Sequence, residues 1–91
     1  MGHNFEWDEA KAQWNIKKHR IGFDEAKTVF NDERSITIDD PDHSTEEERY
    51  IDIGRSEMGH ILVVVYAERG NNVRIISARK AASAEIREYE R

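Results

Sequence analysis

The chain has 91 residues and a formal net charge of −5, with 37% hydrophobic and 36% charged residues. This length allows one domain with one hydrophobic core, and we expect residues 1–91 to form it. The lack of cysteine excludes disulfides, thiolate metal sites and a cysteine nucleophile. The longest apolar run, 61–67, is far below the roughly 20 residues that cross a bilayer, and the first residues lack a basic and apolar signal segment, so we expect a cytoplasmic protein without membrane contact.

The first third of the chain predicts two helices. Asp8 is a typical N-cap, and the spacing of the apolar residues after it predicts an amphipathic helix that ends near His19. Asp24 predicts the cap of a second helix, and Asn31-Asp32 its end. We expect the large apolar side chains of this region and of the last helix to be buried against a sheet: Trp7, Trp14, Phe23, Phe30 and Ile86.

From residue 34 onward the sequence predicts strands, because the apolar residues change from a helical spacing to an alternation of period two. The expected strands are 34–39, 50–53, 61–66 and 73–79, followed by a short helix with an apolar stripe at Ala82, Ile86 and Tyr89. Short connections between the strands favour an antiparallel meander. We therefore predict an α+β fold with two N-terminal helices, a four-stranded antiparallel sheet and a C-terminal helix.

Charge is unevenly distributed along the chain. Residues 32–57 hold ten acidic and three basic residues, whereas residues 58–91 hold six basic and four acidic ones. The net charge argues against direct binding to DNA or RNA, but the uneven distribution allows one basic face on an acidic protein. Such a face would suit either a nucleic acid or an acidic segment of a partner protein.

Known catalytic motifs are missing from the sequence. There is no glycine-rich nucleotide loop, no paired metal-ligand spacing and no Gly-x-Ser-x-Gly elbow, so we expect no cofactor and no metal. What remains is a set of polar side chains that strands and strand ends bring into reach of one another: His19, Arg49, Tyr66, Arg69, Arg79 and Lys80.

The arginines have a structural and a functional interpretation. Strict alternation puts Arg79 on the same strand face as Val73 and Ile75, at the end of that face. In an up-and-down hairpin Arg69 and Arg79 lie at opposite ends, which weakens the case for a simple pair. The structural interpretation, favoured for any single arginine, is a salt bridge to the acidic middle segment.

His19 and Tyr66 also have two interpretations. A histidine at the end of a helix often serves only to interact with the helix dipole. Histidine also titrates near neutral pH, so His19 could act as a general acid or base beside Lys17, Lys18 and Arg20, which could hold a phosphate. An aromatic residue in a strand belongs to the core more often than it stacks on a base, which applies to Tyr66.

Several sequence blocks occur together in one order between about residue 5 and residue 89. They are Phe5-Glu6-Trp7-Asp8, Lys11-Ala12, Asn15, Lys18-His19, Phe23-Asp24-Glu25-Ala26, Val29-Phe30, Glu48-Arg49, Ile53-Gly54, Ser56, Leu62-Val63-Val64-Val65-Tyr66, Arg69, Arg74-Ile75-Ile76-Ser77-Ala78-Arg79 and Ala81. In this combination the sequence resembles the BrnT family of bacterial toxins, the toxic halves of type II toxin–antitoxin modules. Three residues depart from the family pattern: Arg20 where the family often has Gly, His60 where Arg or Lys is usual, and Ala67 where Thr is common.

The resemblance implies a compact RelE-like fold and a ribonuclease that stops growth by shutting down translation. It also implies neutralisation by a BrnA-like antitoxin, by family analogy in a dimer of heterodimers, with operator DNA bound only through the antitoxin. The family motifs give functional weight to His19, Arg49, Arg69 and Arg79. The RNA substrate that the resemblance implies is either free RNA or RNA on the ribosome.

Cleavage of RNA without a metal requires a base for the 2′-hydroxyl, cations for the phosphate and an acid for the leaving oxygen. We hypothesise that Arg69 and Arg79 clamp the phosphate with Arg49 as a third cation, and that His19 or Tyr66 moves a proton. The expected RNA-binding cations are Lys17, Lys18 and Lys80.

Two other functions remain open from the sequence. One is a non-catalytic module whose basic face docks a segment of a partner protein, and the other is a co-repressor that acts with a DNA-binding partner. Binding without strand scission would distinguish the first from a nuclease.

Overall fold

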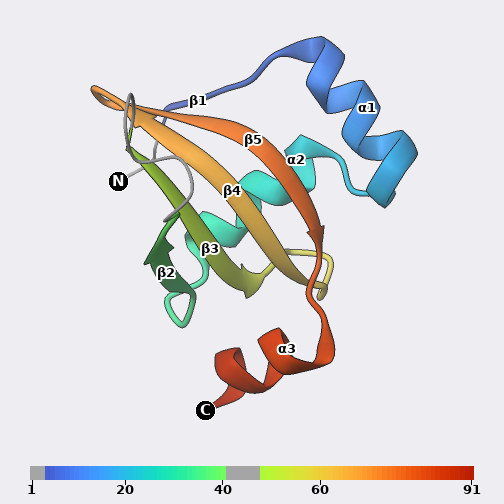
Figure 1. The fold of residues 1–91 in the computed structure, drawn as a ribbon, viewed down its shortest axis with the longest axis vertical. Helices are drawn as coiled ribbons and strands as arrows, with labels where there is room; N and C mark the ends of the chain where they lie inside the picture. Colours follow the sequence, from blue (N-terminus) through green and yellow to red (C-terminus); the bar gives the residue numbers. More distant parts are fainter. Residues whose placement is uncertain (1–3, 41–47) are drawn as a thin grey trace.

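The computed structural model describes residues 4–40 and 48–91, which form a mixed five-stranded sheet with helices (Figure 1). The strands are β1 (Asn4–Glu6), β2 (Ile36–Asp39), β3 (Arg49–Arg55), β4 (Ile61–Arg69) and β5 (Asn72–Lys80), in the sheet order β1-β5-β4-β3-β2. The predicted α+β class and the antiparallel meander from β2 to β5 are confirmed. The prediction of a purely antiparallel, four-stranded sheet is wrong, because β1 adds a parallel strand at the free edge of β5.

The helices are α1 (Glu9–His19), α2 (Phe23–Ala26), the 3-10 helix η1 (Lys27–Asn31) and α3 (Ser83–Glu90). The predicted start of α1 is confirmed, because the carboxylate of Asp8 accepts a hydrogen bond from the backbone N–H of Lys11 at 3.1 Å. The predicted cap of the second helix is wrong. That helix begins at Phe23, after Gly22, whose carbonyl accepts the first helical hydrogen bonds, and Asp24 lies inside it.

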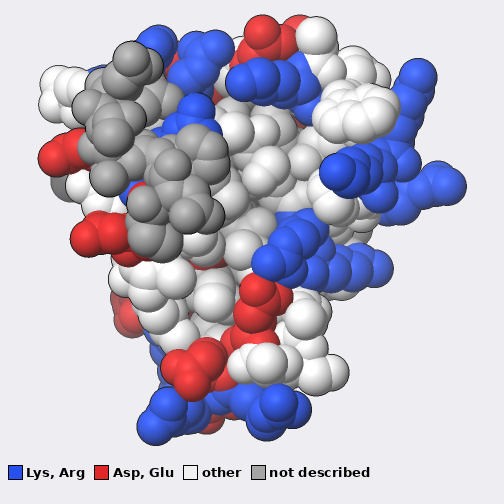
Figure 2. All heavy atoms as spheres, in the orientation of Figure 1, with Lys and Arg blue, Asp and Glu red and all other residues white. Residues whose placement is uncertain are grey.

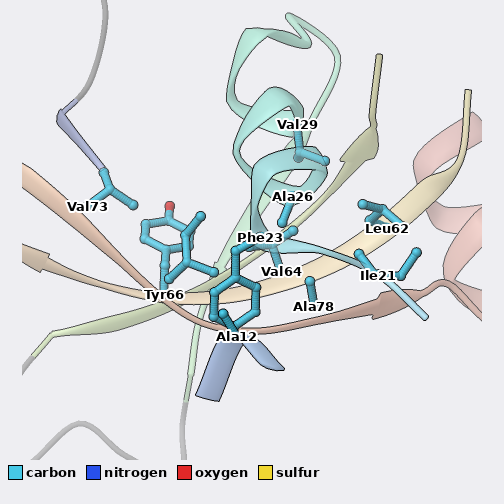
Figure 3. Packing of buried hydrophobic residues seen from close by; sticks show 11 residues of the cluster. Ala12, Ile21, Phe23, Ala26, Val29, Leu62, Val64, Tyr66, Val73 and Ala78 are labelled. Atoms are coloured by element: carbon cyan, nitrogen blue, oxygen red, sulfur yellow. The ribbon is translucent and has the colours of Figure 1, made fainter. Parts of the chain in front are cut away.

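One face of the sheet is covered by the N-terminal helices. Helices α1 and α2 pack against β5, and η1 packs against β3. Figure 3 shows Phe23, Ala26 and Val29 of α2 and η1 beside Val64 and Ala78 of the sheet. The buried cluster comprises Ala12, Ile21, Phe23, Ala26, Val29, Leu62, Val64, Tyr66, Val73, Ile75 and Ala78.

The close approach of η1 to β3 depends on a glycine. A Cβ atom on Gly54 would lie 2.8 Å from Cγ1 of Val29 and 2.9 Å from Cβ of Ser35. These distances are shorter than real Cβ contacts, so a larger residue would force η1 away from the sheet.

Trp14 does not join the core, contrary to the sequence prediction. Its side chain is 63% exposed, because α1 turns Ala12 and Asn15 toward the sheet and Trp14 lies about 100° around the helix from Asn15. Trp7 is half-buried and packs edge-to-face on Phe23 with ring centroids 5.8 Å apart.

A β-bulge divides the β4–β5 ladder. Val65 is paired with Ser77 and Tyr66 with Ile75, so Ile76 is an extra residue on β5. The extra residue shifts the phase of the alternation. Ile75 therefore faces the helices, whereas Arg79, predicted on its face by strict alternation, faces the other side of the sheet.

No helix in the described ranges is both long and apolar enough to cross a membrane.

Candidate functional site

The face of the sheet opposite α1 and α2 carries several arginines. We call it the open face. One row across it runs from Arg49 on β3 to Ala67 on β4 and Arg74 on β5, in hydrogen-bonded register. Because Ala67 is small and fully buried, the side chains of the two arginines border a shallow position between them. Arg69 lies on the same face, two residues farther along β4.

Glu6 connects the side chains at the end of the open face that carries Arg69 and Arg74, which we call the upper end. Its carboxylate accepts hydrogen bonds from Asn72 at 2.9 Å and from Arg74 at 3.0 Å, and lies 3.5 Å from the guanidinium of Arg69. The hydrogen bond from Asn72, followed by that from Arg74, lowers the pKa of Glu6 below its ordinary value. One carboxylate thus contacts two guanidiniums at this end.

The opposite end of the open face, which we call the lower end, carries Arg79 and is covered by α3. Both terminal nitrogens of Arg79 donate to Glu85, at 2.8 and 2.7 Å. This bidentate hydrogen bond lowers the pKa of Glu85 to about 2. The hydroxyl of Tyr89 donates to Asp32 at 2.6 Å, and the guanidinium of Arg55 lies 6.0 Å from the centre of the Tyr89 ring.

Asp32 holds the same helix, α3, through the hydrogen bond that it accepts from Tyr89. Burial would raise the pKa of Asp32, but hydrogen bonds from the backbone N–H of Arg55, the hydroxyl of Tyr89 and the backbone N–H of Arg34 hold it below its ordinary value. Asp32 is therefore a carboxylate that links η1, β3 and α3.

Asn15 closes the edge of β5 beyond the short strand β1. Its side-chain amide donates to the carbonyl of Ala78 at 2.8 Å and accepts from the N–H of Ala78 at 3.1 Å, as a neighbouring strand would. The same amide donates to the carbonyl of Ile21 at 2.8 Å. No role for Asn15 was predicted from the sequence, although an asparagine in the middle of a helix is a detectable signal.

Beside this contact, α1 and β5 enclose a pocket of about 340 Å³. We call it the edge pocket. Its lining residues are Lys11, Trp14, Asn15, Lys18, His19, Ile76 and Ser77. Figure 2 shows Lys and Arg side chains over α1 and toward the end of β5, around an uncharged area, with acidic side chains mainly at the left and below.

Metal-binding geometry is not found here: within 4–40 and 48–91, no three His, Cys, Asp or Glu side chains are grouped to hold an ion.

A family comparison identifies this chain. The sequence profile described as "Ribonuclease toxin, BrnT, of type II toxin-antitoxin system" matches residues 7–85. The chain belongs to the BrnT family. Its structure is similar to the 1.1 Å crystal structure of the Brucella abortus ribonuclease toxin BrnT, with a TM-score of 0.66 and 25% identity over 89% of this chain and 99% of that chain. No curated protein matches the sequence.

The BrnT-family arginines named from the sequence do not form one cluster. Arg69 and Val63, the cross-strand partner of Arg79, are six residues apart on β4, or roughly 20 Å. Arg49 lies in the Ala67 row and is nearer to Arg69 than to Arg79. The structure therefore does not bring Arg69 and Arg79 to one phosphate.

The other residues named from the sequence lie in three places. His19 and Lys18 line the edge pocket. Lys17 is exposed on another side of α1, and Lys80 is exposed on the face of the sheet that bears the helices, opposite Leu62. Tyr66 is buried in the core, where burial raises its pKa and its hydroxyl donates to Asp52 at 3.0 Å.

Two of the three departures from the family pattern, Arg20 and His60, are explained by their local structure. Arg20 adopts the left-handed conformation, with φ 63°, at the end of α1, the conformation that glycine adopts most readily. The backbone turn is therefore kept in the presence of a larger side chain at position 20. His60 contacts the carboxylate of Glu25 through Nδ1 at 2.7 Å.

Proposed function

We propose that this chain is an endoribonuclease that cleaves RNA without a metal ion and thereby stops translation. The observation that carries the proposal is the set of guanidinium groups on the open face, where Arg49, Arg69 and Arg74 lie within two residues of one row across the sheet. Guanidinium groups gathered on one face of a sheet are suited to a polyanion. Membership in a family of ribonuclease toxins supports the choice of RNA.

The proposed reaction is an attack by the 2′-hydroxyl on the adjacent phosphorus. A new O2′–P bond forms and the P–O5′ bond breaks, which leaves a 2′,3′-cyclic phosphate and a 5′-hydroxyl. A base takes the proton of the 2′-hydroxyl, and an acid supplies one to the departing O5′. Cations stabilise the additional charge on the phosphoryl oxygens in the transition state.

We assign the reacting phosphate to the region between His19 and Arg79. His19 lines the edge pocket beside Ser77, which is two residues before Arg79 on β5 and faces the same side of the sheet. In this assignment His19 moves the proton, and the fork of Arg79 binds the phosphate after leaving Glu85. Arg49 and Arg69 bind phosphates farther along the strand of RNA.

The remaining sequence candidates receive smaller parts in the proposal. Tyr66 is left out of the proton transfer because its hydroxyl bonds Asp52 within the core. Lys18 contacts RNA from the edge pocket, whereas Lys17 and Lys80 lie outside this path.

The family belongs to type II toxin–antitoxin systems, so an antitoxin is the expected partner. We propose a BrnA-like antitoxin, a dimer of heterodimers, operator contacts made only by the antitoxin, and action in the cytoplasm, on free or ribosome-bound RNA.

The test is induction of the chain in a bacterium, with growth, protein synthesis and RNA 5′ ends measured. Arg79→Ala should reduce cleavage by roughly 10²–10³-fold, the usual effect of removing one electrostatic donor from a transition state. Glu85→Gln is the matched control, because it weakens the same ion pair from the other side while it keeps the guanidinium. Soluble expression is checked for each variant.

New 5′ ends in the wild type and in Glu85→Gln, but not in Arg79→Ala, would support the ribonuclease and the role of Arg79. Arrest without new ends would contradict RNA cleavage but keep a toxin. Normal growth in every culture would favour a non-catalytic binding module.

A further inference from the structure

Trp14 is the largest exposed apolar side chain on α1, and it lies in a pocket. Single exposed apolar residues are common on protein surfaces, so exposure alone indicates nothing. Trp14, however, lines the edge pocket between Lys11 and Lys18, which precede and follow it by about one turn on the same side of α1. An indole wall and two ammonium groups therefore face one space.

The charged residues that line the edge pocket are all basic. Neither Asp nor Glu lines it, and within the described part of the chain none of the side chains of Lys11, Lys18 and His19 forms an ion pair. The chain as a whole carries a net charge of −5, so this local composition is the reverse of the average. The pocket is complementary to an anionic ligand.

A flat aromatic wall and unpaired cations match the two parts of a nucleotide. Aromatic side chains stack on bases without regard to base identity, and lysines bind the flanking phosphates. We infer that the edge pocket binds one nucleotide of single-stranded RNA, with its base stacked on Trp14 and its neighbouring phosphates near Lys11 and Lys18. This inference rests on the proposed function insofar as RNA is the substrate.

The edge pocket is continuous with the proposed cleavage region. Ser77 lines the pocket and also lies on the open face, roughly 7 Å along β5 from Arg79. A strand of RNA held on Trp14 would therefore pass directly to the end of the open face that carries Arg79. Trp14 is a positioning residue in this scheme, since it touches a base and not the reacting atoms.

The test is a binding measurement on the full chain with a short, fluorescently labelled 2′-O-methyl oligoribonucleotide of mixed sequence, which lacks the attacking hydroxyl. Trp14→Ala removes the stacking contact with one base and should weaken RNA binding roughly 5- to 150-fold. Trp14→Phe should keep most of the affinity, because it keeps an aromatic face. Trp14 is exposed, so the variants should fold, and their circular dichroism spectra check this.

Two matched controls lie on the same helix. Ile16→Ala removes another exposed apolar side chain, which is 43% exposed and outside the edge pocket, and should leave affinity unchanged. Lys18→Ala should lower the slope of log affinity against log salt by roughly 0.7, whereas Lys17→Ala should not, since Lys17 does not line the pocket.

Unchanged RNA affinity in Trp14→Ala would overturn the inference, as would absence of RNA binding by the wild type. Weaker capture of the antitoxin with normal RNA affinity would also overturn it and assign Trp14 to a protein interface. The proposed function fails separately: if the wild type binds RNA through Trp14 but creates no new 5′ ends, the inference stands and the nuclease does not. If the wild type cleaves RNA and Trp14→Ala binds normally, the reverse holds.

Discussion

The two ends of the open face use the same pair of residue types in different arrangements. At the upper end one carboxylate, Glu6, lies within 3.5 Å of the guanidiniums of both Arg69 and Arg74. At the lower end Arg79 and Glu85 are matched one to one, through two hydrogen bonds. The upper end therefore offers a phosphate several guanidiniums on one face, whereas both terminal nitrogens of Arg79 at the lower end are engaged until Glu85 moves.

The two carboxylates also come from elements of different kinds. Glu6 belongs to β1, which is hydrogen-bonded in parallel register to β5 within the sheet. Glu85 belongs to α3, an eight-residue helix with no fully buried side chain. A helix this short has little stability apart from its contacts, so the lower end is the one that can open. We therefore expect the upper end to bind RNA and the lower end to act on the reaction.

A lysine at position 79 separates the charge of Arg79 from its geometry. Arg79→Lys keeps the charge but loses the planar fork, so RNA cleavage in a translation extract should fall by roughly 10²-fold. Arg69→Lys should stay within a few-fold of the wild type, because Arg69 interacts with Glu6 at 3.5 Å as a point charge. Equal losses in the two variants would contradict the division of roles between the two ends.

The salt dependence of RNA binding tests the same division without catalysis. Arg69→Ala should reduce the slope of log affinity against log salt by roughly 0.7, because it removes one phosphate contact. Arg79→Ala should leave the slope nearly unchanged, because engaging Arg79 frees the carboxylate of Glu85 and the exchange adds no net positive charge. The measurement is a titration of 2′-O-methyl RNA at several salt concentrations. A similar drop in both variants would show that Arg79 is available without opening.

Features with a local cause were predictable from the sequence. The capped start of α1 at Asp8 and the four strands of the meander follow from spacing and turn residues within short windows. The family blocks directed attention to the arginines of β4 and β5, because their order survives even where single residues differ.

Features that depend on pairing between distant segments were missed. The strand β1 has three residues, too few for a periodic pattern, and its partner β5 lies near the other end of the chain. The bulge at Ile76 cannot be recognised before the register is known, yet it decides that Arg79 faces away from the helices. Trp14 was misplaced because apolar spacing locates a stripe on a helix but not its width.

The backbone is strained at Arg20, directly after His19. Arg20 has φ 63°, a conformation that is unfavourable for any residue with a Cβ. Arg20→Gly should stabilise the fold by about 0.5–1 kcal/mol and raise Tm by several degrees, since glycine adopts this conformation without steric cost. Arg20→Ala keeps the Cβ and should show no such gain. Thermal unfolding of the three proteins checks this, and equal Tm values in Arg20→Ala and Arg20→Gly would contradict it.

The contact between Arg79 and Glu85, which closes the lower end, should make the stability of the fold depend on pH. The pKa of Glu85 is about 2 in the fold, against an ordinary 4.5, because Arg79 donates to its carboxylate. A lowered pKa stabilises the fold at pH values above 4.5, and this contribution disappears as the pH falls from 4.5 toward 2. Glu85→Gln keeps an oxygen that can accept the N–H of Ala82, so the change isolates the charge.

At pH 7 the wild type should be more stable than Glu85→Gln by about 0.2–1 kcal/mol, the range for partly exposed ion pairs. The difference should shrink as the pH falls below 4.5. Glu6 and Asp32 also have lowered pKa values, but they are present in both proteins, so their contributions cancel in the comparison. Urea unfolding of the wild type and Glu85→Gln at pH 7 and pH 3 measures this difference in stability. A difference at pH 3 as large as that at pH 7 would mean that Glu85 holds α3 by hydrogen bonding and not by charge, and that the lower end opens for a different reason.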